Sequence, residues 1–235
     1  MAVKMAPALA SLQVAAQNRE ALRQVWQNIQ PESCPHSYNF HMHTICSDGR
    51  LKPKEVIDQA LTIGLKGFAI TDHHTIGGYK IAQSWLEFLQ RSSPSTSAPH
   101  LWTGVEITAN LLDTEVHILG YAFNPAHSSL EPYLQGHAPR NSDARAAVVV
   151  AALHEAGGLA VLAHPARYRC SAEELIPAAA DLGIDGVEAY YAYANPDPWQ
   201  PSAKQTQQVK KLSATYNLLN TCGTDTHGPN LLRRL

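Results

Sequence analysis

From Tyr38 onward, short apolar runs alternate with longer segments in which apolar positions recur at helical spacing. Short apolar runs are typical of buried strands, and helical spacing is typical of amphipathic helices. The repeated strand–helix order therefore favours an α/β domain. Strands are expected at 38–41, 67–70, 101–107, 116–123, 159–163, 186–190 and 218–222, and helices at 53–64, 78–90, 142–156, 172–182 and 203–216.

Turn-forming residues separate these segments. Ser142 and Ser171 are expected N-caps, and Gly157 and Gly158 are expected to end the helix that begins at Ser142. Residues 91–99 are rich in serine and proline, and residues 124–141 contain three prolines and a glycine. Both segments are expected to form irregular surface loops.

One additional helix is expected before the first strand. Leu12, Leu22 and Trp26 belong to an apolar series at helical spacing within residues 9–29, and Pro31 closes the run. This helix is expected either to pack on the outside of the domain or to form a dimer contact, and the oligomeric state is left open. Residues 1–37 are therefore expected to be an N-terminal helical extension, and residues 38–235 the main domain.

Composition limits the classes of partner. A chain of 235 residues with 45% hydrophobic residues is long enough for one large domain with a real core. The net charge of −2 provides no basic field, so tight binding to duplex nucleic acid is not expected, whereas a small anionic substrate remains open. The four cysteines form no C-x-x-C pair, which indicates reduced thiols and a cytoplasmic location. No apolar run approaches the length of a membrane span, so no membrane partner is expected.

Six short segments that follow or lie within expected strands combine histidine with carboxylate residues or contain one of the two. They are FHMHTICSDG (40–49), TDHH (71–74), GVE (104–106), HILGY (117–121), AHP (163–165) and GTDTHG (223–228). Histidine and carboxylate side chains bind Zn, Mn and Fe, and α/β barrels place functional residues at the carboxyl ends of their strands. In an extended segment His41 and His43 point to the same side, where both can bind one ion. The distribution predicts one polynuclear metal site.

The order H-x-H-T-x-x-S-D-G, T-D-H-x-T, G-x-E, H-x-L-G-Y, A-H-P and D-x-H resembles the PHP (polymerase and histidinol phosphatase) family of metal-dependent phosphoesterases over residues 38–235. The segments HPARY and GTDTHG are most similar to the branch of nucleoside 3′,5′-bisphosphate phosphatases and the related RNase AM type of 5′ to 3′ exonuclease. The resemblance implies a distorted (β/α)7 barrel of the PHP type, here with an extra N-terminal helix.

The resemblance also implies three divalent ions in one cleft, of Mn, Fe or Zn. The first ion would bind His41, His43, Glu106 and Asp225; the second would bind Asp48, His73 and His227; the third would bind His117, His164 and Glu106, whose carboxylate would bridge. The residues expected to serve the catalytic step are Asp48, His73, Asp225 and His227. Open positions on the ions would accept water or phosphate, as catalytic sites require.

Contacts to the substrate are expected from Arg167, Arg169 and His74. A guanidinium of Arg167 or Arg169, close after His164, can hold a phosphate through paired hydrogen bonds. His74 is either a substrate contact or a solvent-facing loop residue. Asp72 is expected to orient a neighbouring ligand or the turn. Alternatives for the phosphate contact are Lys52, Arg145 and His137.

The expected activity is hydrolysis of a small phosphomonoester or nucleotide, such as a nucleoside 3′,5′-bisphosphate, by metal-activated water. Alternatives are a 5′ to 3′ exonuclease acting on short RNA or DNA ends, a histidinol-phosphate phosphatase, and a non-catalytic PHP module. Relatives in the nucleotide branch usually carry a sizeable insertion with a G-R-P-H-like motif before the A-H-P strand. This chain has only residues 124–159 there and lacks the motif, so a more open cleft is expected.

Overall fold

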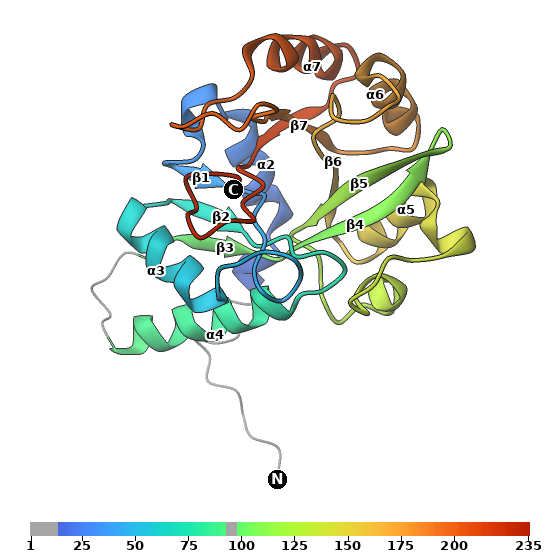
Figure 1. Cartoon of the computed structure of the whole chain (residues 1–235). Coiled ribbons are helices and arrows are strands. Elements are labelled where there is room, and N and C mark those ends of the chain that lie inside the picture. Colours follow the sequence, from blue (N-terminus) through green and yellow to red (C-terminus); the bar gives the residue numbers. More distant parts are fainter. Residues whose placement is uncertain (1–13, 93–97) are drawn as a thin grey trace.

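The computed structural model describes residues 14–92 and 98–235, which form an α/β fold (Figure 1). Its elements in chain order are α2 (Arg19–Gln27), η1 (Pro31–Ser33), β1 (Tyr38–Asn39), α3 (Pro53–Ile63), β2 (Gly67–Ala69), α4 (Gly77–Ser92), β3 (His100–Trp102), β4 (Gly104–Leu111), β5 (Thr114–Tyr121), η2 (Ser128–Tyr133), η3 (Asn141–Ala144), α5 (Ala146–Glu155), β6 (Leu159–Leu162), α6 (Ala172–Asp181), β7 (Gly186–Tyr190), α7 (Ala203–Thr215) and β8 (Leu219–Cys222). The α/β class expected from the sequence is confirmed.

The strands are hydrogen-bonded as two sheets. The parallel sheet β1-β2-β3 contains three strands, and the sheet β4-β5-β6-β7-β8 contains five, of which β5 runs antiparallel to both neighbours. Backbone contacts join the sheets on two sides. The N–H of Phe40 donates to the carbonyl of Cys222 at 3.1 Å and Met42 bridges Thr226, while His73 bridges Glu106. Residues just beyond β1 and β2 are thereby brought against β8 and β4.

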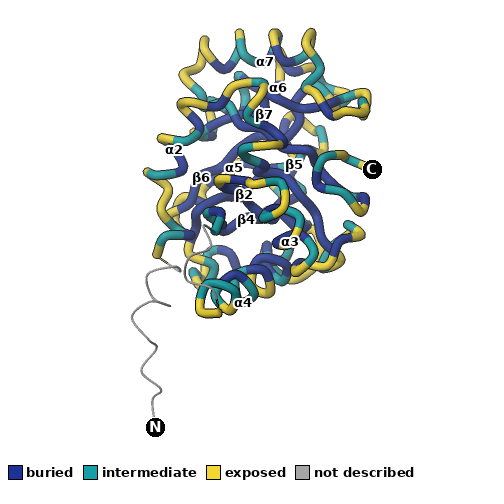
Figure 2. The backbone as a smooth tube through the Cα atoms, turned by 90° about the vertical axis from the view of Figure 1, so that its left-hand side faces the viewer, coloured by how far each residue is buried: buried dark blue, intermediate teal, exposed yellow. Residues whose placement is uncertain are grey.

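Most elements lie within a few residues of their expected positions because the end signals act locally. Gly64 takes a left-handed φ of 82° at the C-cap of α3. Ser171 caps α6 through a capping box with Glu174, as its position predicted. Figure 2 shows the strands as the buried centre of the molecule, with exposed residues on the outer sides of helices such as α4 and α7.

The expected strand 101–107 is wrong in one respect, because the structure divides it at Thr103. The Thr103 hydroxyl donates to the carbonyl of Phe123 at 2.9 Å, and its backbone N–H donates to the carbonyl of Ala16 at 3.1 Å. The strand before it, β3, pairs with β2, and the strand after it, β4, pairs with β5. Thr103 is therefore the point at which the chain passes from one sheet to the other.

The region before α5 also differs from expectation. Ser142 is not the N-cap, because residues 141–144 form the 3-10 turn η3 and Arg145 stands at the N-cap of α5. Residues 124–141 are not wholly irregular, since the 3-10 helix η2 buries Leu130 and Tyr133. These two buried apolar side chains pack residues 124–141 against the domain.

The expected continuous helix over residues 9–29 is wrong, because Asn18 interrupts it and caps the start of α2, while residues 1–13 lie outside the described residues. Within α2, Leu22 and Trp26 are buried. The Trp26 ring contacts Phe40 and Tyr121 edge-on at centroid distances of 5.9 and 5.2 Å, and Arg23 pairs with Asp185. The helix therefore packs against the domain. Among the described residues, none of the helices is both long and apolar enough to cross a membrane.

Candidate metal centre

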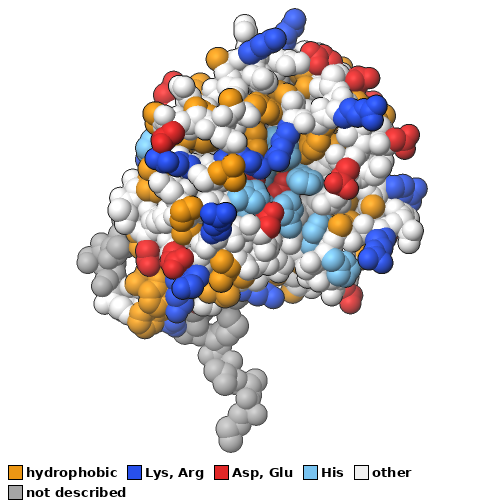
Figure 3. Space-filling model, viewed as in Figure 1, with side chains coloured by type: hydrophobic (Ala, Val, Ile, Leu, Met, Phe, Trp, Pro, Cys, Tyr) orange, Lys and Arg blue, Asp and Glu red, His pale blue; other side chains and the backbone are white. Residues whose placement is uncertain are grey.

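The predicted ligands come from segments far apart in the chain and meet on one face of the fold. Figure 3 shows histidine and carboxylate side chains gathered in a hollow at the centre of this face, with basic side chains beside it. Glu106 and His117 lie on β4 and β5, and the others follow β1, β2, β6 and β8. All nine predicted ligands have at least one side-chain contact within the group: His41, His43, Asp48, His73, Glu106, His117, His164, Asp225 and His227.

The first predicted set forms a fully buried cluster. The ligand atoms of His41, His43, Glu106 and Asp225 all lie within 4.8 Å of one another. Glu106 Oε2 lies 2.9 Å from Nε2 of His41 and 3.0 Å from Nε2 of His43. Asp225 Oδ1 lies 3.3 and 3.2 Å from the same two nitrogens. Two imidazoles and two carboxylates thus converge as they would around one cation.

The second predicted set lies nearer the surface. His227 Nε2 is 3.2 Å and His73 Nε2 is 3.6 Å from Asp48 Oδ2, and the side chain of Asp48 is 53% exposed. His43 joins this group, because its Nδ1 lies 3.4 Å from Asp48 Oδ1. His43 therefore has one ring nitrogen toward each set, which the sequence prediction did not include.

The third predicted set converges on the other oxygen of Glu106. Its Oε1 lies 2.7 Å from Nδ1 of His117 and 3.5 Å from Nε2 of His164. Glu106 thus presents Oε2 to the first set and Oε1 to the third, the geometry of a bridging carboxylate. Two groups of potential ligands cross the predicted sets: His73 with Glu106 and His117, and His41 with His164 and Glu188.

The charges of these groups fit a cation site. Burial acts to raise the pKa values of Glu106 and Asp225, yet the surrounding histidines hold both well below their usual range. Burial acts to lower the pKa of His43, but hydrogen bonding and charge from Asp225 and Glu106 raise it to about 9. In the metal-free protein, protons on imidazoles balance the carboxylates. The ring nitrogens of His43 lie 3.0 to 3.4 Å from carboxylate oxygens of Glu106, Asp225 and Asp48, so a cation could take the place of a proton between these groups.

Asp72 holds the loop that carries three of the ligands. Its carboxylate accepts hydrogen bonds from the Thr44 backbone N–H at 2.6 Å, the Thr44 hydroxyl at 2.7 Å and the Ser47 hydroxyl at 2.9 Å. A Cβ at Gly78 would lie only 2.0 Å from Asp72 Oδ2, so this position has no room for a side chain. Asp72 therefore orients the turn between His43 and Asp48.

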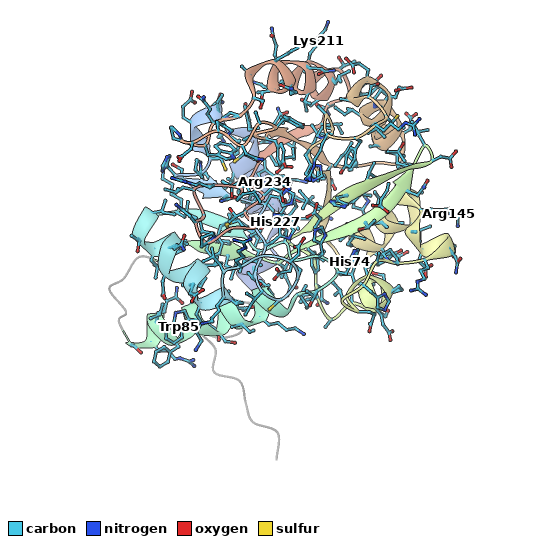
Figure 4. All side chains as sticks on the ribbon, viewed as in Figure 1. His74, Trp85, Arg145, Lys211, His227 and Arg234 are labelled. Carbon is cyan, nitrogen blue, oxygen red and sulfur yellow. The ribbon has the colours of Figure 1, made fainter. Side chains whose placement is uncertain are left out.

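Oδ2 of Asp225, the oxygen that points away from His41 and His43, is bound by two residues that lie outside the six motif segments. Asp225 Oδ2 accepts from the hydroxyl of Tyr191 at 2.8 Å and from Nε of Arg234 at 2.8 Å. Nη1 of Arg167 approaches the same oxygen at 3.4 Å, and the Arg167 side chain is 45% exposed. Figure 4 shows Arg234 beside His227 at the centre of this face. The structure thus brings Arg167 to the site and adds Tyr191 and Arg234.

The other two predicted substrate contacts, Arg169 and His74, lie in different surroundings. Arg169 is exposed and forms no ion pair with any described residue. His74 is buried, not solvent-facing; its Nε2 lies 3.1 Å from the Thr108 hydroxyl. Burial and nearby His117 lower the pKa of His74 to about 4, so its ring is neutral at pH 7. Among the alternatives, Arg145 lies at the edge of the fold in Figure 4, away from His227.

Glu188 is the main residue that sequence reasoning missed. It is 1% exposed on β7 and contacts His41. A signal was present, because Gly186, Val187 and Glu188 repeat the G-V-E triplet of residues 104–106. An acidic residue within a wholly buried strand needs a polar partner, and the histidine cluster supplies it.

Comparison with known proteins agrees with this geometry. The PHP domain profile matches residues 39–210. A 5′-3′ exoribonuclease, Rnm, of Salmonella typhimurium is 25% identical over 263 aligned positions, covering 82% of this chain and 85% of that protein. A 3′,5′-nucleoside bisphosphate phosphatase of Chromobacterium violaceum is 31% identical over 138 positions, covering 59% of this chain and 45% of that protein.

A solved structure shares the fold at lower sequence identity. An amidohydrolase of Chromobacterium violaceum, with bound sulfate and no metal, superposes with a TM-score of 0.67 at 21% identity over 85% of this chain and 90% of that one. The family profile spans most of the chain, and the buried histidine, glutamate and aspartate clusters supply the chemistry that such a profile implies. The chain belongs to the PHP domain family of metal-dependent phosphoesterases.

Proposed function

We propose that this chain hydrolyses a phosphomonoester of a nucleotide, with a nucleoside 3′,5′-bisphosphate as the preferred class of substrate. The observation that carries the proposal is the position of Glu106, whose two oxygens face two different groups of histidines. Such an arrangement can hold neighbouring ions at a distance suited to phosphoryl chemistry. When bound, divalent ions would supply an acidified water and would neutralise charge on the phosphate.

The protein's own residues have distinct roles in this proposal. The nine predicted ligands would hold the ions, and Mn, Fe and Zn all suit a mixed nitrogen and oxygen set. Asp48, His73 and His227 lie toward the surface, where a phosphate could reach them, and Asp225 is the carboxylate beneath them. We further propose that the two sheets, joined by the backbone contacts between Phe40 and Cys222 and between His73 and Glu106, correspond to the distorted (β/α)7 barrel of the family. Residues 38–235 would then form the catalytic domain and residues 1–37 an extension, of which α2 packs on the domain.

Arg167 and Arg234 support a substrate with two phosphate groups. Each directs one guanidinium nitrogen to Asp225 Oδ2, which leaves other N–H donors of each side chain for an anion. Guanidinium groups match the geometry of phosphate oxygens. One phosphate would lie among the ligands while a second would be bound by this pair. The Chromobacterium violaceum relative acts, by its name, on such a bisphosphate.

A second candidate activity is removal of nucleotides from the 5′ end of short RNA. The observation that favours it is the likeness to the Salmonella typhimurium exoribonuclease, which extends over most of both chains. Asp48, 53% exposed, lies at an accessible edge of the site, where a longer substrate could enter. By contrast, the approach of all nine ligand positions to one another gives no support to a non-catalytic module.

The test is phosphate or nucleotide release from adenosine 3′,5′-bisphosphate, AMP, histidinol phosphate and a short 5′-phosphorylated RNA, with Mn²⁺ and with chelator. The proposal predicts chelator-sensitive release, fastest from the bisphosphate. Asp225→Asn and His227→Ala should abolish turnover without unfolding the protein, whereas Asp113→Asn makes the same chemical change as Asp225→Asn at an exposed turn and should have no effect. No release from any substrate by the metal-loaded protein would contradict the proposal, and faster release from RNA would favour the second candidate.

A further inference from the structure

His41 lies between carboxylates on both sides of its ring. Its Nε2 faces the cluster, at 2.9 Å from Glu106 Oε2, and its Nδ1 is 3.0 Å from Glu188 Oε1. Both glutamates are 1% exposed and His41 is fully buried. Because an ionised carboxylate can only accept hydrogen bonds, Glu188 requires a proton on Nδ1 of His41. That proton leaves the lone pair of a neutral ring on Nε2, toward Glu106 and Asp225.

The second oxygen of Glu188 holds another predicted ligand by its backbone. Glu188 Oε2 accepts from the backbone N–H of His164 at 2.9 Å. His164 has a φ of 28°, a left-handed conformation that is costly for a residue with a side chain. This conformation aims its Nε2 at Glu106 Oε1. One buried carboxylate thus fixes both the ring of His41 and the main chain of His164.

We propose that Glu188 is a positioning residue of the metal centre, which holds His41 in the Nδ1-protonated form and holds His164 in its strained backbone conformation. This inference rests on the proposed function, because it takes His41 and His164 as ligands. Glu188 would act through them without itself coordinating an ion, since it contacts Nδ1 of His41, the ring nitrogen opposite the one that faces Glu106, and the backbone N–H of His164. Carboxylates that hydrogen-bond metal-binding histidines fix the ring orientation and increase its basicity.

The chemistry of the side chain makes the inference testable by a small change. In Glu188→Gln the amide retains one oxygen but turns an NH₂ group toward one of the two N–H donors. Only one of the two contacts can then survive. Glu188→Asp keeps the charge but is shorter by one methylene, so it should lengthen both contacts. Glu115→Gln, at an exposed position of β5, makes the same chemical change away from the site and serves as the control.

The experiment measures Zn²⁺ affinity by chelator competition and metal equivalents at saturation, with thermal melting as the check of folding. Glu188→Gln should bind Zn²⁺ about 10- to 100-fold more weakly at unchanged saturating stoichiometry, Glu188→Asp should be intermediate, and Glu115→Gln should match wild type. Unchanged affinity in a folded Glu188→Gln would overturn the inference. Loss of a whole equivalent at saturation would also overturn it, because Glu188 would then be a ligand.

A second readout follows the proton itself. In ¹H–¹⁵N spectra of the Zn²⁺-loaded protein, wild type should show a strongly hydrogen-bonded Nδ1–H of His41, identified by its absence in His41→Asn. This signal should shift or disappear in Glu188→Gln and persist in Glu115→Gln. An identical signal in Glu188→Gln would contradict the inference. Neither measurement uses substrate, so failure of the proposed activity and failure of this inference remain separable.

Discussion

Replacement of Glu106 by glutamine tests the centre most directly, because this carboxylate faces two groups of histidines at once. Oε1 lies 2.7 Å from His117 Nδ1, and Oε2 lies 2.9 and 3.0 Å from Nε2 of His41 and His43. Ions bound by these rings would share a single buried negative charge. The substitution preserves the shape of the side chain and removes that charge.

The expected magnitude follows from Coulomb's law. Two unit charges about 4 Å apart, at an effective dielectric of about 20, attract by about 4 kcal/mol, which corresponds to nearly 10³-fold in affinity, and the attraction is about twice as large for a divalent ion that faces Glu106. Because the carboxylate is shared, the loss should affect more than one ion. We therefore expect Glu106→Gln to retain fewer equivalents of metal than wild type, by more than one, after dialysis against a weak chelator.

Elemental analysis of the dialysed protein measures the equivalents, and circular dichroism reports whether the variant is folded. Glu115→Gln serves again as the control, since it lies on the neighbouring strand β5 with an exposed side chain. A folded Glu106→Gln variant that keeps the wild-type metal content would refute the bridge. A loss of one equivalent or less would show that Glu106 serves a single ion.

Two further predictions concern the supports of the site. Gly78→Ala places a Cβ 2.0 Å from Asp72 Oδ2 and 2.8 Å from the Thr44 hydroxyl. It should therefore lower the free energy of unfolding by about 1–3 kcal/mol, as measured by urea denaturation. An unchanged urea midpoint would show that the turn adapts freely. Burial lowers the pKa of His74 to about 4, whereas in the unfolded chain it is about 6.5. As the pH falls below 6.5, the unfolded metal-free chain therefore gains a proton on His74 before the folded protein does, and the free energy of unfolding declines toward pH 4. His74→Gln should therefore lose less stability than wild type between pH 7 and pH 5, and equal losses would show that His74 does not contribute.

Sequence patterns predicted the features that depend on neighbouring residues in the chain. They did not predict contacts between residues that only the folded chain brings together. Ligands at the ends of strands could be placed because successive strands end on one face. Glu188 meets His41 across 147 positions, and no periodicity reports such a pairing. Arg234 contacts Asp225 from a segment without regular secondary structure, and it belongs to no motif, so the sequence did not indicate this contact.

Errors in the expected elements have a similar physical origin. The apolar run at 101–107 is continuous in sequence, yet Thr103 bonds to the Phe123 carbonyl and separates two strands that belong to different sheets. Ser142 has the chemistry of an N-cap, but it is taken into a 3-10 turn, and α5 starts at Ala146. At Thr103 a tertiary contact overrides a valid local preference, and before α5 the 3-10 turn is followed by Arg145, which bridges Asn110 of β4.

The contact between β1 and the segment after β8 has a consequence for the order of folding. The side chain of Asn39 bonds to Thr224 across 185 positions, and His41 accepts the backbone N–H of Asp225 on its carbonyl. Contacts between residues so distant in sequence form slowly, because a long loop must close first. During synthesis His41 and His43 emerge well before Asp225 and His227. We therefore expect the complete cluster of ligands to form late in folding, when the two distant segments meet.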